Sequence, residues 1–223
     1  MTNTLASPQL EGVLERMFAA ASRDDDLDEP ALPLQRTSWS QATAAERSGA
    51  FADHYIPISA QAGRLLYVLA RAIRPRTVVE FGTSFGISTV FLAAAVTDNG
   101  SGHVVTSELS EKKAAAARAN LSEAGVGDAV TILIGDALET LGSVPGPVEL
   151  VLLDGWKDLS LPVLHLLEPK LAPGALVAAD DITHASMAAY LEYVRNSAGR
   201  YVTVPFPIED GLEISSWTGS ADA

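Results

Sequence analysis

Acidic side chains stand directly after two strand-like apolar runs in the second half of the chain. Asp154 follows the run 148–153, and Asp180 and Asp181 follow the run 175–179. If these runs are neighbouring parallel strands, the three carboxylates meet at the carboxyl edge of a sheet, where open α/β sheets bind ligands. Crowded carboxylates repel one another unless a cation joins them, and oxygen ligands suit Mg²⁺, Ca²⁺ or Mn²⁺. The sequence therefore predicts a divalent metal site at these aspartates, against the alternative that each caps the helix after its strand.

A lysine accompanies the first of these acids. Lys157 lies three residues after Asp154. Alone, a lysine is typical of a solvent-exposed surface. An amine that is partly enclosed beside a metal can have its pKa lowered, which lets it take a proton near neutral pH. We therefore expect Lys157 to act as a general base.

A glycine-rich turn follows an earlier apolar run that contains Glu80. Gly82 and Gly86 are separated by three residues, and such a turn lets backbone amides approach a ligand closely. The spacing is not the G-x-G-x-x-G of dinucleotide-binding proteins. Glu108 ends the next run, 22 residues after Gly86, where an acid can accept hydrogen bonds from ribose hydroxyls. NAD would use the same acid, so Glu108 alone does not choose between cofactors.

These candidate residues need a particular set of elements to position them. From about residue 77, short β-branched runs alternate with helical patterns, which predicts an α/β fold with helices on both faces of a parallel sheet. Two final runs, near 201–205 and 212–217, predict a hairpin-like antiparallel pair at the sheet edge. Residues 1–55 are expected to form a helical cover, and residues 56–223 the core, of one compact domain.

Composition and charge exclude several classes of function. The chain has 223 residues, 15 Lys and Arg against 28 Asp and Glu, and a formal net charge of −13, so nucleic acid is not an expected partner. No apolar run is long enough to span a membrane and no signal peptide is recognisable, so we expect a soluble, cytoplasmic protein. The absence of cysteine excludes disulfides and thiolate metal sites.

Four stretches resemble the catechol O-methyltransferase family, the small metal-dependent O-methyltransferases that include caffeoyl-CoA-type members. They are VVEFGTSFGIST, VLLDGWKDLSLPVLHLLEP, LVAADDI and DGLEIS. The resemblance implies a Rossmann-like class I methyltransferase fold, with a seven-stranded, mostly parallel sheet and an antiparallel last strand. It further implies S-adenosylmethionine as methyl donor, a divalent cation such as Mg²⁺, a catechol-like aromatic acceptor and a homodimer.

The resemblance also implies a role for individual residues. Asp154, Asp180 and Asp181 correspond to the metal ligands, and Lys157 corresponds to the general base on the acceptor hydroxyl. Glu213 corresponds to the acid that holds the second hydroxyl of a catechol, so the expected catalytic group is Asp154, Lys157 and Glu213. The positions that match cofactor-binding residues are Ile58, Glu80, Gly82, Thr83, Ser84, Ser88, Glu108, Asp136, Ala137, Asp154 and Trp156.

The sequence departs from the family pattern at three of its positions. Gly155 stands where the animal enzyme has a histidine that contacts adenine, and Ser84 stands where it has a tyrosine. Asp181 replaces a common asparagine, which adds negative charge at the expected metal. Two other functions remain open: an NAD(P)-dependent oxidoreductase with a Rossmann-type fold, and a metal-independent relative that binds S-adenosylmethionine. His184 is expected near the mouth of the cleft, where it could touch a substrate.

Overall fold

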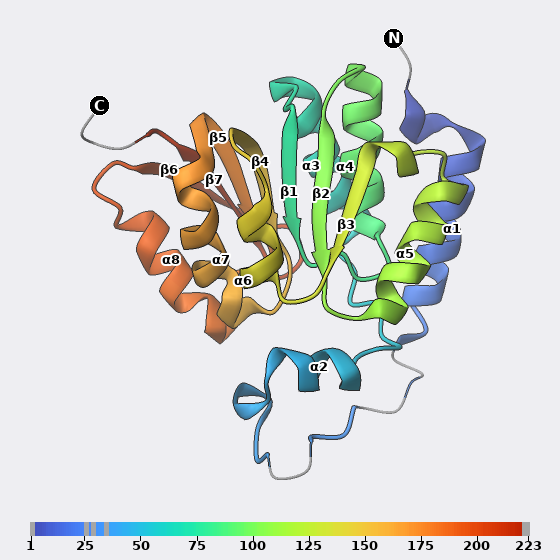
Figure 1. Cartoon of the computed structure of the whole chain (residues 1–223), viewed down its shortest axis with the longest axis horizontal. Coiled ribbons are helices and arrows are strands. Elements are labelled where there is room, and N and C mark those ends of the chain that lie inside the picture. The colour runs from blue at the N-terminus through green and yellow to red at the C-terminus, as the bar shows by residue number, and fades with distance from the viewer. Residues whose placement is uncertain (1–2, 25–26, 28–29, 34–35, 220–223) are drawn as a thin grey trace.

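A seven-stranded sheet lies at the centre of the computed structural model, which describes residues 3–24, 27, 30–33 and 36–219 (Figure 1). The strand order is β3-β2-β1-β4-β5-β7-β6. The first five strands along the chain pair in parallel, whereas β7 runs antiparallel to both β5 and β6. This confirms the predicted fold class, with the final antiparallel pair at the sheet edge. The strands are β1 Thr77–Phe81, β2 His103–Glu108, β3 Val130–Ile134, β4 Val148–Leu153, β5 Leu171–Ala179, β6 Tyr201–Phe206 and β7 Leu212–Trp217.

Helices cover both faces of the sheet and create two apolar cores. One core joins the sheet to α1, α3, α4 and α5, and the other joins it to α6, α7 and α8. The central strands β1 and β4 are mostly apolar because both of their faces are buried, and each contains one glutamate, Glu80 in β1 and Glu149 in β4. None of the described helices has the length and apolarity that crossing a bilayer requires. The helices are α1 Pro8–Ala21, α2 Ala44–Ala50, α3 Ala60–Ile73, α4 Ile87–Asn99, α5 Glu111–Glu123, α6 Ala137–Thr140, α7 Ser160–Leu167 and α8 Ala188–Arg195.

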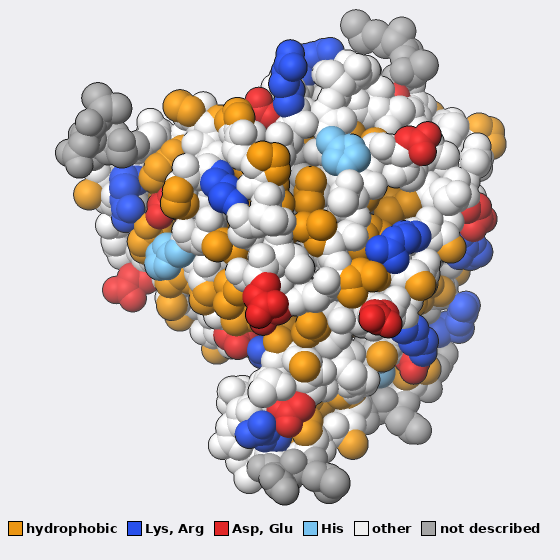
Figure 2. Space-filling model, viewed as in Figure 1, with side chains coloured by type: hydrophobic (Ala, Val, Ile, Leu, Met, Phe, Trp, Pro, Cys, Tyr) orange, Lys and Arg blue, Asp and Glu red, His pale blue; other side chains and the backbone are white. Residues whose placement is uncertain are grey.

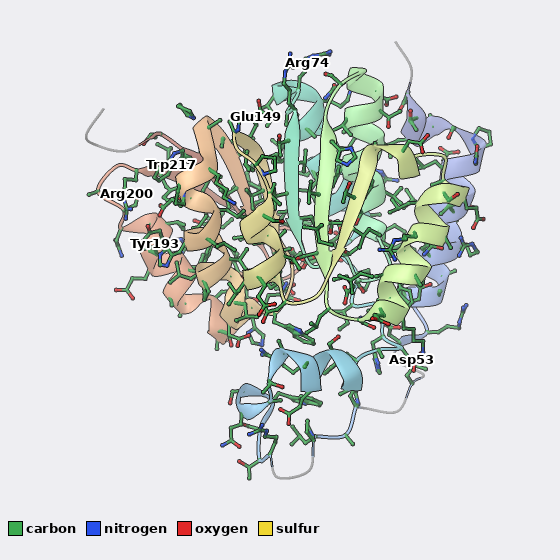
Figure 3. The ribbon with its side chains drawn as sticks, viewed as in Figure 1. Asp53, Arg74, Glu149, Tyr193, Arg200 and Trp217 are labelled. Carbon is green, nitrogen blue, oxygen red and sulfur yellow. The ribbon has the colours of Figure 1, made fainter. Side chains whose placement is uncertain are left out.

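The N-terminal part of the chain contributes to the fold in two different ways. Helix α1 is part of the core, because Leu10, Val13 and Met17 are buried on it. Helix α2 instead lies beyond the carboxyl ends of the strands (Figure 1), and its segment projects as a lobe from the main body (Figure 2). A capping box between Thr43 and Glu46 starts this helix. The segment that follows α2 returns to the core past Asp53, which is labelled in Figure 3.

Candidate active site

The three predicted metal ligands converge at the carboxyl edge of β4 and β5. The backbone of Asp154 continues the ladder by donating to the carbonyl of Phe81 (2.9 Å), and Asp180 does the same to Leu153 (3.0 Å). Asp154, Asp180 and Asp181 each offer a carboxylate oxygen, and these oxygens lie within 4.8 Å of one another. The short helices that follow the two strands begin after Trp156 and His184. The aspartates are therefore a cluster and not helix caps.

Lys157 completes this cluster. Its Nζ lies 2.9 Å from a carboxylate oxygen of Asp154 and 2.9 Å from one of Asp181. Burial alone would lower the pKa of Lys157, but the facing carboxylates of Asp154, Asp181 and Asp180 outweigh it and raise that pKa above its ordinary value. This arrangement of charges thus raises the pKa of Lys157, whereas the sequence predicts a lowered pKa. The expectation assumed a cation beside the amine, whereas the described side chains give it three anions.

The electrostatics of the cluster favour a further positive charge. Burial and the neighbouring carboxylates raise the pKa of Asp180, and burial chiefly raises the pKa of Asp154. Three carboxylates face a single ammonium, so their mutual repulsion is only partly relieved. All the ligand atoms are carboxylate oxygens, which is the donor set that hard divalent cations prefer. The residues present therefore fit a Mg²⁺-type ion.

The glycine turn after β1 packs directly against the Asp154 turn. Gly82 has a φ of +102°, and a Cβ atom there would lie 2.7 Å from the carbonyl oxygen of Asp154 and 2.7 Å from the amide of Gly155. Only glycine allows both the backbone conformation and this approach. Opposite the turn, the carboxylate of Glu108 accepts hydrogen bonds from the amides of Ser84 and Ser110, each 2.8 Å long. These bonds fix the orientation of the Glu108 carboxylate.

One cavity of about 550 Å³ joins the glycine turn to the acidic cluster. It is bounded at one end by the residues after β1, β2 and β3, and at the other by those after β4 and β5. Glu80, Asp180 and Glu213 do not line it, although Asp180 belongs to the cluster behind its wall. The predicted site residues that line the cavity are Ile58, Gly82, Thr83, Ser84, Ser88, Glu108, Asp136, Ala137, Asp154, Trp156, Lys157 and Asp181.

Glu80 lies beneath the glycine turn. Its side chain is completely buried and accepts a hydrogen bond of 2.6 Å from the hydroxyl of Thr89. Burial raises the pKa of Glu80 to about 7, from an ordinary value of 4.5. The position of this side chain, which is bonded to Thr89 on α4 and does not line the cavity, therefore does not support the predicted direct contact with the cofactor.

The raised pKa of Glu80 predicts how stability depends on pH. Because folded Glu80 holds its proton more tightly than the unfolded chain does, its contribution to stability is lost as pH rises from about 4.5 to about 7. Glu80→Gln keeps the shape but cannot ionise, so it should be more stable than the wild type at pH 8 by about 3 kcal/mol and equal to it below pH 4.5. Denaturant unfolding across this range measures the difference. The exposed Glu192→Gln serves as control, and an unchanged pH dependence in Glu80→Gln would refute the prediction.

Glu213 is held away from the cavity. Its two carboxylate oxygens accept hydrogen bonds from Arg195, 2.9 and 2.6 Å long, and one of them also accepts from the hydroxyl of Thr203 at 2.5 Å. The side chain is completely buried. The sequence-based role of Glu213, holding a second acceptor hydroxyl, is therefore at odds with this structure. The reason is that Arg195, in the last turn of α8, engages the carboxylate.

The Arg195–Glu213 pair predicts a stability effect. Arg195→Met would leave a buried carboxylate without its cation, which should cost about 3 kcal/mol, the low end for a broken buried pair because Arg195 is itself 43% exposed. Denaturant unfolding measures this loss. Arg16→Met is the matched control, since Arg16 and its partner Glu123 are both exposed and should contribute less than about 1 kcal/mol. A small loss of stability together with a higher KM for the acceptor in Arg195→Met would instead support the predicted role of Glu213 in holding the substrate.

The sequence interpretation missed the residues that α2 and the residues on either side of it bring to the cavity. Trp39, Arg47 and Phe51 line it, and the ring of Phe51 lies 5.0 Å from that of Trp39 and 5.8 Å from that of Trp156. The T-A-A-E capping box at 43–46 could have located the helix. Nothing in the local sequence indicates that it reaches the cavity. His184, in contrast, does line the cavity as considered above.

Solved structures and a family profile define the class of protein. A sequence profile described as a methyltransferase domain matches residues 79–182, from within β1 to one residue past Asp181. The structure of cofactor-bound Rv0187 from MTB is similar with a TM-score of 0.71 and 26% identity, over 94% of this chain and 91% of that one. TomG from Streptomyces achromogenes, an O-methyltransferase solved in complex with SAM, gives a TM-score of 0.66 and 25% identity, over 92% and 99%. The fold is that of class I methyltransferases.

Two sequence relatives are catechol O-methyltransferases. The catechol O-methyltransferase of Mycobacterium tuberculosis is 37% identical over 156 residues, which are 70% of this chain and 66% of that protein. The catechol O-methyltransferase of Niastella koreensis is 30% identical over 57% of this chain and 58% of that protein. The chain thus spans slightly less than two thirds of these relatives. Its residues 79–182 match a methyltransferase domain, and the chain is similar in sequence to these catechol O-methyltransferases.

Proposed function

We propose that this protein is an S-adenosylmethionine-dependent O-methyltransferase that methylates one hydroxyl of a vicinal dihydroxy aromatic compound with the help of a divalent cation. One observation carries the proposal. The cavity that contains the glycine turn and Glu108 ends at Asp154, Lys157 and Asp181, where Nζ of the lysine lies 2.9 Å from a carboxylate oxygen of each aspartate. A nucleoside-binding end and a cluster suited to a metal therefore share one enclosed space.

The donor end of the cavity suits the adenosine part of S-adenosylmethionine. The carboxylate of Glu108 would accept hydrogen bonds from the ribose hydroxyls, and its orientation is already fixed by the amides of Ser84 and Ser110. Trp156 and Ala137 line the same cavity and offer apolar contact to a purine ring. The close packing of Gly82 on the Asp154 turn brings the donor end next to the acidic cluster.

The acceptor end suits two adjacent oxygens. Asp154, Asp180 and Asp181 would hold the divalent cation, because their oxygens converge within 4.8 Å. When bound, such a cation supplies a Lewis acid that lowers the pKa of a phenol and orients it, and S-adenosylmethionine supplies a methyl group on a positively charged sulfur. Two vicinal hydroxyls can both bind one cation, whereas a single hydroxyl makes one such contact. The site therefore favours catechol-like acceptors.

Lys157 is placed to handle the proton of the acceptor. Its Nζ is 2.9 Å from two of the cluster carboxylates, so an oxygen held at the cluster would lie within its reach. In the overall reaction the acceptor oxygen gains the methyl group, the sulfur keeps the electron pair of the broken bond, and the hydroxyl proton passes to the neutral amine of Lys157. A cation held by the three aspartates would favour that neutral form, because it would offset the carboxylates that otherwise keep the amine protonated. Charge is neutralised as the methyl group moves, so a cavity that excludes water favours the transfer.

A binding titration tests the donor assignment against the oxidoreductase alternative. S-adenosylhomocysteine and NADH are each titrated into the protein by calorimetry. We expect S-adenosylhomocysteine to bind and NADH not to, because the turn lacks the middle glycine of the dinucleotide fingerprint. Binding of NADH without binding of S-adenosylhomocysteine would overturn the proposed function.

A further inference from the structure

Helix α2 is joined to the core by a bidentate ion pair. Nη1 of Arg47 lies 2.8 Å from one carboxylate oxygen of Asp158, and Nη2 lies 3.0 Å from the other. The two residues are 111 positions apart in the sequence. The Arg47 side chain is 12% exposed and the Asp158 side chain 44% exposed, so only the arginine side of the pair is shielded from solvent. This contact fixes α2 at one point above the strand ends.

The same arginine also contacts a wall of the cavity. The guanidinium of Arg47 lies 4.9 Å from the ring centroid of Trp156, within range of a cation–π interaction. Trp156 and Asp158 flank Lys157 in the sequence. Nε of Arg47 is buried without a hydrogen-bond partner among the described residues. An arginine held in this way bridges three parts of the site, namely α2, the tryptophan wall and the turn that carries the lysine.

A second arginine in the segment around α2, residues 36–53, provides a contrast. This segment is called the arm below. Arg36 pairs with Glu46 at 3.1 Å, so both partners belong to the α2 segment. Its side chain is 35% exposed. Both ends of the Arg36–Glu46 pair therefore lie within the arm, whereas the Arg47–Asp158 pair joins the arm to the core. Comparing the two separates closure of the cavity from internal stability of the arm.

We propose that Arg47 is a positioning residue that holds α2 over the cavity and fixes the Trp156 wall, so that both substrates bind in an enclosed site. The closure itself rests on contacts within the chain, while its effect on substrates rests on the proposed function. Arg47 touches neither the cluster aspartates nor the Nζ of Lys157 in any described hydrogen bond or ion pair. It should therefore affect binding more than the chemical step.

Hydrogen exchange of the ligand-free protein tests the closure without any activity. In Arg47→Met, amides of residues 44–52 should exchange about tenfold faster than in the wild type, because the link between α2 and the core is lost. In Arg36→Met the same amides should change by less than about twofold. Unchanged exchange in Arg47→Met, or an equal change in both variants, would overturn the proposal.

Binding and turnover test the consequence for the site. Arg47→Met should weaken S-adenosylhomocysteine binding and raise the acceptor KM by about fivefold to tenfold, while kcat at saturation changes by less than about threefold. Asp158→Asn should change both quantities in the same direction, and the double variant should be no worse than Arg47→Met alone, because Asp158 acts through its link to Arg47. A fall in kcat with unchanged binding, or additive effects, would refute a positioning role. If the wild type binds no S-adenosylhomocysteine, the proposed function fails, and the exchange experiment still decides on the closure.

Discussion

Asp154→Ala is expected to lower kcat/KM for a catechol by about a thousandfold or more. Asp154 supplies one of the three clustered carboxylates and also contacts Lys157. Its loss would remove a metal ligand and disturb the base together, and metal assistance is worth several kcal/mol of transition-state stabilisation. Mass spectrometry of the methylated product measures the effect. EDTA should abolish wild-type activity, and Mg²⁺ should restore it.

Two controls separate this effect from unfolding. Removing one of several crowded carboxylates relieves repulsion. The melting temperature of Asp154→Ala should therefore lie at most a few degrees below that of the wild type. Asp128→Ala, an exposed aspartate outside the cavity, should keep full activity. Near-normal activity of Asp154→Ala, or wild-type turnover that EDTA leaves intact, would show that the reaction does not depend on a metal at this site.

Lys157→Met is expected to lower kcat by about a hundredfold to ten-thousandfold, the usual contribution of a general base. Lys157→Arg should be nearly as inactive, because a guanidinium keeps the positive charge but cannot give up its proton. A general base acts in its unprotonated form, so the wild-type rate should increase with pH as the amine of Lys157 loses its proton. This increase should be absent in both variants.

A pH profile of kcat with saturating substrates measures these differences. Lys112→Met is a matched control, because Lys112 is exposed on α5 and pairs with Asp53 outside the cluster. An active Lys157→Arg enzyme would show that the lysine serves only as a charge. The same pH dependence in the wild type and in Lys157→Met would assign the titration to another group.

The fold and the acidic edge could be predicted because both depend on local sequence. A buried parallel strand needs a continuous apolar run, and the residue after that run must lie at the carboxyl edge of the sheet. Asp154 and Asp180 follow such runs, and the structure places them side by side. The role of Gly82 could be predicted in the same way, because a glycine between strand and helix indicates a close approach of the backbone.

The rest of the site depends on contacts between distant parts of the chain. The side chain of Glu213 is engaged by Arg195, which belongs to another element, and nothing in the stretch DGLEIS indicates this. Arg47 meets Asp158 only because the segment before α3 folds back over the strand ends. The direction of the Lys157 pKa shift likewise depends on distances to three carboxylates, two of them on the neighbouring strand end.

The most direct measurement compares catechol with its meta isomer, resorcinol, as methyl acceptors in the presence of Mg²⁺ and of EDTA. The enzyme and S-adenosylmethionine are the same in all four reactions, and mass spectrometry detects the methyl ether. If the carboxylate cluster acts through a cation that holds two adjacent oxygens, only catechol with Mg²⁺ is methylated at an appreciable rate. Equal methylation of both isomers, or of catechol in EDTA, would contradict this account.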